Sequence, residues 1–158
     1  MEMIELIKPE QVLTLRAGNK MQVLQELVRR AAKALDLDVQ IILDPVMARE
    51  ALGSTGVGDG VAVPHARVPG LKRFFALFAR LERPINFDAV DGQPVDLVFL
   101  LLIPAEAEKD HLAALACVAR RLRDPEVARQ LRASSEPAVL YKVLASAIPN
   151  GAAVAGRV

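Results

Sequence analysis

Most of the residues in this chain that could carry chemistry lie in one stretch, REALGSTGVGDGVAVPHAR, from residue 49 to residue 67. Arg49 offers a guanidinium group, whose planar fork matches the oxygens of a phosphoryl group. Ser54 and Thr55 add two hydroxyl donors, and His65 adds an imidazole that can act as a nucleophile near neutral pH. Because the chain contains no G-x-S-x-G motif, this combination favours the handling of a phosphoryl group over acyl transfer.

Plainer interpretations of the same residues stay open. Arg49 could complement the C-terminal end of a helix, and His65 could be a surface histidine in a turn. The three glycines between residues 56 and 60 could bring backbone N–H groups to phosphate oxygens, or they could form a turn between a helix and a strand, which is the commoner use of glycine. The spacing G-x-G-x-G, with a helix before it and a strand after it, does not fit the dinucleotide-binding fingerprint, and the Gly-Lys-Ser/Thr of a nucleotide P-loop is absent.

The two histidines of the chain could meet at one site. Pro64 precedes His65, and because proline cannot donate to a sheet ladder we expect it to end the strand 61–63 and to direct the imidazole outward. His111 falls near the start of a later predicted helix, where it could be a core-edge residue or a neighbour of His65. Two histidines far apart in the sequence, with no cysteine cluster, do not form a zinc pattern, so we expect no metal ion.

The composition argues against several classes of protein. The 158 residues are 53% hydrophobic, which is ample for one core, and a net charge of +1 gives no reason to bind nucleic acid or an anionic membrane. The arginines between residues 120 and 132 alternate with acids and lack stacking aromatics, which indicates a solvated helix face. The longest uncharged apolar run, 97–105, is far shorter than the about 20 residues of a membrane helix. A single cysteine, Cys117, excludes an internal disulfide, and we expect a cytoplasmic protein.

Apolar periodicity predicts helices at both ends of the chain and strands in its middle. Pro45 could kink the second helix or begin a new one. The run 95–103 is apolar throughout, which suits the centre of a sheet, whereas 82–94 with its Asp91-Gly92 pair suits a loop. This order predicts an α/β fold, a single domain whose central mixed β-sheet is flanked by helices on both faces. The expected helices are 19–35, 38–52, one from 110 onward, 124–133 and 135–147, and the expected strands are 61–63, 71–81 and 95–103.

The stretch from Arg49 to Arg67 resembles the active-site signature of the EIIA component of the phosphoenolpyruvate-dependent phosphotransferase system, in its fructose/mannitol class. The later segments FARLERPINFDAVDGQPVDLVFLLLIP and DHLAALACVARRLRD are similar to the following parts of the same domain. The resemblance covers residues 4–146, and we expect 147–158 to be a flexible tail. The segment LGSTGVGDGVAVPHA is most similar to the nitrogen-regulatory branch of the family.

The resemblance implies that His65 is phosphorylated, on Nε2, by an HPr-like donor (NPr), while Nδ1 is held by a backbone partner. It implies that Arg49 and His111 help to hold the phosphoryl group and that Ser54 and Thr55 lie in the same pocket. Such a protein is a phosphocarrier with a phosphohistidine intermediate rather than a turnover enzyme on a small molecule, and it needs no cofactor.

Three functions remain open at this point. A lone EIIA-like domain favours a regulatory phosphocarrier, whose targets in the family include potassium transport and regulatory kinases; the sequence selects none of them. A sugar-transport EIIA would instead pass the phosphoryl group to a cysteine of a separate EIIB. A binding module that has lost phosphotransfer is disfavoured by the intact set of Arg49, His65 and His111. The oligomeric state is not indicated by the sequence, and no nucleic-acid or membrane partner is expected.

Overall fold

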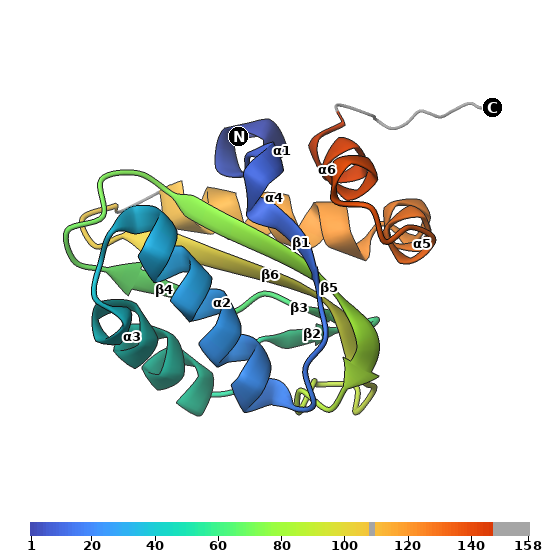
Figure 1. Ribbon diagram of the computed structural model, residues 1–158, viewed down its shortest axis with the longest axis horizontal. Helices are drawn as coiled ribbons and strands as arrows, with labels where there is room; N and C mark the ends of the chain where they lie inside the picture. Colours follow the sequence, from blue (N-terminus) through green and yellow to red (C-terminus); the bar gives the residue numbers. More distant parts are fainter. Residues whose placement is uncertain (108–109, 147–158) are drawn as a thin grey trace.

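The apolar run predicted as a central strand forms β6 (Val95–Pro104), the middle strand of a six-stranded mixed sheet. The computed structural model describes residues 1–107 and 110–146 (Figure 1). β5 (Phe75–Ile85) pairs antiparallel with β6, and β1 (Val12–Leu15) pairs parallel with β5. On the other side of β6 lie β3 (Val61–Ala62) and β4 (His65–Val68), one after the other and both parallel to it.

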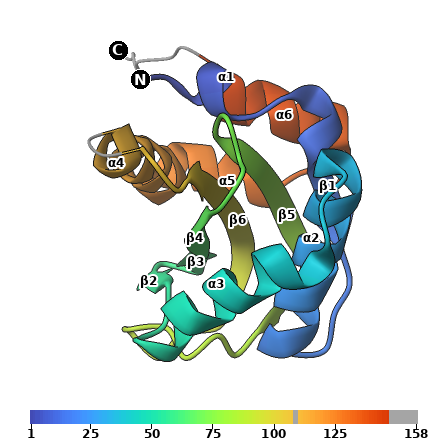
Figure 2. The ribbon, with the colours of Figure 1, turned by 90° about the vertical axis from the view of Figure 1, so that its left-hand side faces the viewer.

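Helices cover both faces of this sheet, as predicted (Figures 1 and 2). Side chains alternate along β6, so that Leu100 packs into the core under α2 and α3 while Leu101 packs into the opposite core. None of the helices in the described ranges is both long and apolar enough to cross a membrane. The helical elements are α1 (Met3–Leu6), the 3-10 turn η1 (Pro9–Gln11), α2 (Lys20–Leu35), α3 (Val39–Ala51), α4 (Asp110–Arg123), α5 (Pro125–Arg132) and α6 (Pro137–Ala145).

The predicted helices begin close to where their capping residues stand. The side chain of Asn19 accepts a hydrogen bond from the backbone N–H of Gln22, and that of Asp38 accepts one from Gln40, so α2 and α3 each begin one residue later. α3 continues through Pro45, and no new helix begins there.

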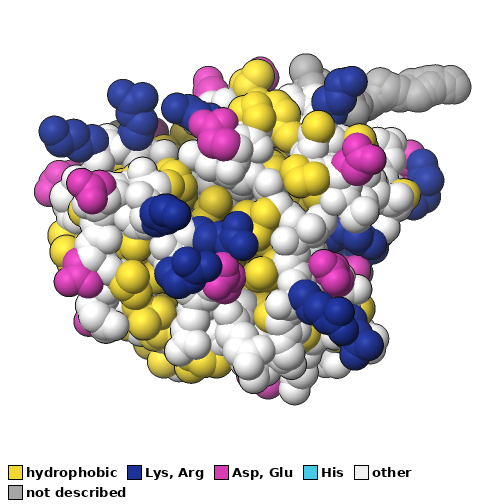
Figure 3. Space-filling view, in the orientation of Figure 1, with side chains coloured by type: hydrophobic (Ala, Val, Ile, Leu, Met, Phe, Trp, Pro, Cys, Tyr) yellow, Lys and Arg dark blue, Asp and Glu magenta, His cyan; other side chains and the backbone are white. Residues whose placement is uncertain are grey.

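Basic and acidic side chains are interspersed over the face that carries α2 (Figure 3), so this face is not a surface of a single charge.

Some elements depart from the expectation. β5 begins at Phe75 rather than at residue 71 and runs to Ile85, because its pairing with β6 resumes at Ile85 and Val95 after an irregularity. The first part of the predicted loop 82–94 is therefore strand. Five elements of four residues or fewer were not predicted, because they are too short to show a period: α1, η1, β1, β2 (Gly56–Gly58) and β4. The predicted tail, 147–158, lies outside the described residues.

The glycine-rich stretch forms a short hairpin rather than an irregular turn. β2 (Gly56–Gly58) pairs antiparallel with β3, and Gly60 stands in the connecting turn with φ of +78°. A Cβ at Gly60 would lie 2.4 Å from a guanidinium nitrogen of Arg132. A Cβ at Gly56 would lie 2.8 Å from the Cβ of Ala89. Close packing against Ala89 thus explains Gly56, and the positive φ of the turn explains Gly60.

Candidate functional site

His65 is the first residue of β4, opposite Leu101 of β6, and its side chain is half-buried. β3 ends at Ala62, shortly before Pro64 as expected, but pairing with β6 resumes at His65 in β4. Pro64 only separates β3 from β4, and its carbonyl accepts a hydrogen bond from the N–H of Leu101 at 2.9 Å. Proline lacks a donor but keeps its acceptor, so the ladder to β6 continues past it.

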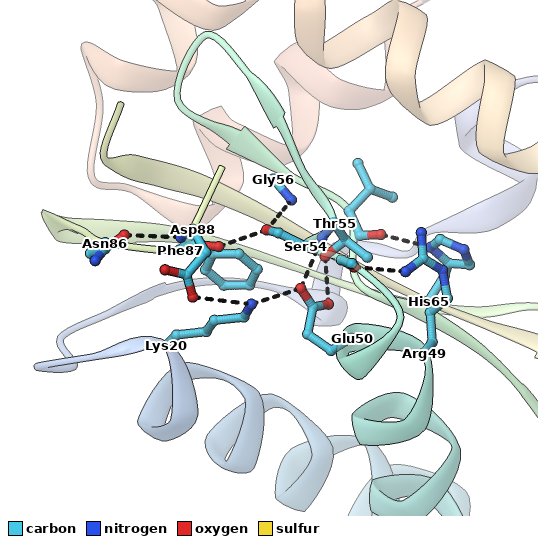
Figure 4. Close-up of polar contacts among 12 residues, drawn as sticks. Lys20, Arg49, Glu50, Ser54, Thr55, Gly56, His65, Asn86, Phe87 and Asp88 are labelled. Carbon is cyan, nitrogen blue, oxygen red and sulfur yellow. Dashed lines mark hydrogen bonds and ion pairs between the residues drawn. The ribbon is translucent and has the colours of Figure 1, made fainter. Parts of the chain in front are cut away.

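A backbone carbonyl fixes the protonation pattern of the His65 ring. Nδ1 of His65 lies 2.8 Å from the carbonyl oxygen of Val63 (Figure 4). A carbonyl can only accept a hydrogen bond, so Nδ1 must carry the proton. In the neutral ring the lone pair then stands on Nε2, which is the state of an imidazole that can attack an electrophile.

The surroundings of His65 keep the ring neutral. Burial is the largest cause and lowers the pKa of the imidazole below its ordinary value of 6.5, because a buried ring loses the solvation of its charged form. The positive charge of Arg49 and the neighbouring His111 lower the pKa further, whereas the bond to Val63 and the charge of Glu50 oppose the shift. The net effect leaves the Nε2 lone pair available at neutral pH.

The side chain of Arg49 bonds to the backbone near the end of α3 and also lies near His65. It stands in the last turn of α3, and Nη1 of its guanidinium donates to the carbonyl oxygen of Gly53 at 2.8 Å, just beyond the end of the helix. Its side chain also reaches the neighbourhood of the His65 ring, where its charge acts on the imidazole (Figure 4). One fixed guanidinium thus satisfies a carbonyl near the helix end and places positive charge beside the His65 ring.

His111 belongs to the same site, held there by an arginine that we did not single out. In β4, Ala66 and Val68 pack into the core under α2 and α3, so His65 and Arg67 project from the other face of the strand. Nη2 of Arg67 lies 3.0 Å from Nδ1 of His111, in the first turn of α4. Because a guanidinium only donates, Nδ1 of His111 accepts, and the proton of its neutral ring stands on Nε2. The two histidines therefore hold opposite tautomers.

Arg67 also fixes the segment that leads into α4. Its Nη1 donates to the carbonyl oxygens of Ala105, at 3.1 Å, and of Ala107. Both carbonyls lie between the end of β6 and the start of α4, which carries His111. The position of Arg67, two residues after His65 on a strand, is the sequence signal that would have identified it, since alternate residues of a strand share a face.

The hydroxyl groups of Ser54 and Thr55 are already engaged with the protein. Oγ of Ser54 donates to the carbonyl oxygen of Phe87 at 2.6 Å and accepts from the N–H of Gly56 at 3.0 Å. Thr55 is buried, with 3% exposure, and its Oγ1 donates to a carboxylate oxygen of Glu50 at 2.7 Å. Both hydroxyls fasten the segment between α3 and β2, near His65 (Figure 4).

Glu50 is a further polar residue of this region that sequence reasoning missed. It is only 7% exposed, although it is charged, and its partners are Thr55 and Lys20. A signal was present, because Glu50 stands four and eight residues after Val46 and Ile42, on the buried face of α3. A carboxylate on an apolar helix face requires partners, and these partners lie beside the site. Among the described residues, no group of three or more His, Cys, Asp and Glu side chains is placed to hold a metal ion.

Comparison with known proteins gives one consistent family. Residues 5–147 match the family model described as "Phosphoenolpyruvate-dependent sugar phosphotransferase system, EIIA 2". The chain is 49% identical over 146 residues to a nitrogen regulatory protein of Bradyrhizobium diazoefficiens, covering 92% of this chain and 95% of the relative. It is 42% identical over 127 residues to the nitrogen regulatory protein of Escherichia coli K12, covering 80% and 78%.

A solved structure agrees with the sequence comparison. The crystal structure of the nitrogen regulatory protein IIA-Ntr from Neisseria meningitidis superposes with a TM-score of 0.82 at 33% identity, covering 90% of this chain and 97% of that one. The mixed sheet with helices on both faces is therefore the fold of this relative as well. The chain belongs to the type-2 EIIA family of the phosphoenolpyruvate-dependent phosphotransferase system, in its nitrogen-regulatory branch.

Proposed function

We propose that this chain is a regulatory phosphocarrier of a nitrogen-related phosphotransferase system, in which Nε2 of His65 accepts a phosphoryl group from the phosphohistidine of an HPr-like donor (NPr). The observation that carries the proposal is the hydrogen bond from Nδ1 of His65 to the carbonyl oxygen of Val63. This bond leaves the lone pair of a neutral ring on Nε2, and the lowered pKa of the imidazole keeps the ring neutral.

The proposed transfer is a displacement at phosphorus. The bond from phosphorus to the donor nitrogen breaks as the bond from phosphorus to Nε2 of His65 forms, and the donor imidazole leaves with the electron pair of the broken bond. The proton on Nδ1 of His65 stays in its hydrogen bond to Val63, so the carbonyl dipole stabilises the positive ring that results. No other proton has to move.

Arg49 and His111 are the groups that we propose to stabilise the transferring phosphoryl group. Its charge spreads over three equatorial oxygens in the transition state, so fixed donors placed before the reaction lower the barrier. Arg49 supplies a guanidinium, and the tautomer set by Arg67 places an N–H on Nε2 of His111. Ser54 and Thr55 stay in the proposed pocket, but a direct bond from either hydroxyl proton to phosphate requires its present bond to be exchanged.

The regulatory part of the proposal follows from the family. Members of the type-2 EIIA family take part in phosphotransfer between proteins. We propose that addition of a phosphoryl dianion at His65 changes which target proteins bind the surrounding surface, with potassium transporters and sensor kinases as candidate targets and the cytoplasm as the compartment.

Charging of the full chain by its donor tests this proposal. The chain is incubated with phosphoenolpyruvate, enzyme I and the HPr-like donor, and is then examined by intact mass and peptide mapping. We expect one acid-labile phosphoryl group on the peptide that contains His65. No added group with a charged donor, or a group on a different residue, would contradict the proposal. Rapid loss of the group to a separate EIIB domain would favour the sugar-transport function instead.

The pH dependence of the imidazole gives a second prediction. Because burial and the nearby Arg49 lower the pKa of His65, we expect the folded chain to titrate at this ring below pH 6.5. The unfolded chain then binds more protons in the window just below 6.5, so this histidine lowers the unfolding free energy as the pH falls through that window. Titration of the ring by ¹H–¹⁵N NMR, with the urea-unfolded chain as control, measures the shift. A folded midpoint at or above the unfolded one would contradict it.

A further inference from the structure

Glu50 and Lys20 form an ion pair that is withdrawn from solvent. Nζ of Lys20 lies 3.0 Å from Oε2 of Glu50, and the two side chains are 21% and 4% exposed. A carboxylate in such a place is costly unless it has a counter-charge and hydrogen bonds. Lys20 supplies the counter-charge from the first turn of α2, whereas Glu50 stands in the last turn of α3.

A continuous series of hydrogen bonds leads from Glu50 to the His65 ring. Oε2 of Glu50 accepts from the backbone N–H of Thr55 at 2.8 Å, and Oε1 accepts from its hydroxyl at 2.7 Å. The carbonyl oxygen of Thr55 accepts from the N–H of Val63 at 3.0 Å, and the carbonyl of Val63 accepts from Nδ1 of His65 at 2.8 Å. The N–H and the carbonyl of Val63 are thus both hydrogen-bonded, and Figure 4 shows Glu50 at one end of this series and His65 at the other.

Lys20 joins a further segment to the same point. Its Nζ lies 3.8 Å from Oδ2 of Asp88 and 4.8 Å from the centre of the Phe87 ring, and the carbonyl of Phe87 accepts the hydroxyl proton of Ser54. The start of α2, the end of α3 and the 86–88 segment therefore all meet at the two residues that precede β2.

We propose that the Lys20–Glu50 pair is a positioning device for phosphoryl transfer: it fixes Thr55, and through Thr55 the Val63 carbonyl that selects the tautomer of His65. This inference rests on the proposed function of His65. Glu50 touches neither the ring nor the phosphoryl group and acts through Thr55 and Val63. If the Val63 carbonyl shifts, Nδ1 loses its acceptor, and the proton can move to Nε2, where it removes the attacking lone pair.

The Glu50→Gln variant of the full chain tests the inference. The amide keeps the shape of the side chain, removes its charge and leaves one acceptor oxygen in place of two. We expect the His65 ring of the uncharged protein to change from one tautomer to a mixture of both, seen in two-bond ¹H–¹⁵N spectra. We expect kcat for acceptance from the charged donor to fall about 10-fold or more, since small misplacements near a reacting atom have effects up to about 100-fold, with the KM for the donor unchanged.

A matched control is Glu26→Gln, which removes a carboxylate whose partners Arg29 and Arg30 lie on its own helix. It should leave the tautomer and kcat as in the wild type. If Glu50→Gln does not fold, Lys20→Met breaks the same ion pair from the other side and should shift the tautomer in the same direction. A folded variant with lower denaturation midpoint, but with the wild-type tautomer and kcat, would overturn the inference.

The two proposals fail separately in this design. The tautomer is measured on the unphosphorylated chain, so it reports on Glu50 even if the donor never charges His65. Absence of charging in the wild type would contradict the proposed function, while a shifted tautomer in Glu50→Gln would still show that Glu50 positions the His65 ring. Normal charging together with an unchanged tautomer in the variant would contradict the positioning role alone.

Discussion

The His65→Gln variant is expected to accept no phosphoryl group from a charged HPr-like donor. The amide nitrogen of glutamine has no lone pair available for attack on phosphorus. The loss should be complete, because the proposed pathway has one nucleophile. Intact mass after incubation with the donor system measures it, and peptide mapping shows whether any other residue is modified.

Two controls make this result specific. The circular dichroism spectrum and denaturation midpoint should stay close to those of the wild type, since His65 is half-buried and not part of either apolar core. His111→Asn should still accept the phosphoryl group from the donor to some extent, because His111 is proposed to assist the transfer and not to receive the phosphoryl group. Full charging of His65→Gln, or charging that is lost only in His111→Asn, would show that a residue other than His65 is the nucleophile.

The Arg49→Met variant should slow phosphoryl acceptance by about 100-fold to 1,000-fold, the usual effect of removing one preorganised donor from a charged transition state. The substitution also removes a positive charge that lowers the pKa of His65, so the pKa of the ring should rise toward 6.5. Stopped-flow transfer from the charged donor and NMR titration of the ring measure the two effects.

Arg49→Lys and Arg83→Met are the matched variants. Lysine keeps the charge but not the planar fork, so its rate should fall between those of the wild type and Arg49→Met. Arg83 is exposed on β5, and its substitution should change neither quantity. An unchanged rate in Arg49→Met would show that the guanidinium serves only the carbonyl at the end of α3.

Sequence periodicity predicted those elements whose environment is uniform along their length. α2 shows one apolar stripe, and β6 is apolar on both faces because helices cover both sides of the sheet. The predicted bounds of β5 were wrong because the ends of a strand depend on its pairing, and Ile85 belongs to the strand only through its partner Val95. The hairpin at β2 was missed because glycines carry no side-chain pattern, and its geometry follows from contacts with Ala89 and Arg132, far along the chain.

The candidate site divides in a similar way. His65 and Arg49 could be identified locally, because residue type and spacing already suggest a nucleophile beside a cation. That His111 lies with them was left open by the sequence, and it depends on Arg67 reaching across from β4 to the start of α4. The partners of Glu50 follow from the packing of α2 against α3, which no local pattern contains. The nearby hydroxyls of Ser54 and Thr55 are engaged in bonds that only the fold reveals.

The central claim is that Nε2 of His65 receives the phosphoryl group while Nδ1 keeps its proton on the Val63 carbonyl. The most direct test is ¹⁵N and ³¹P NMR of the charged, ¹⁵N-histidine-labelled chain. The account predicts a phosphorus coupling to Nε2 of His65 and a protonated Nδ1 with a slowly exchanging hydrogen. Phosphorus coupled to Nδ1, or to either nitrogen of His111, would contradict it.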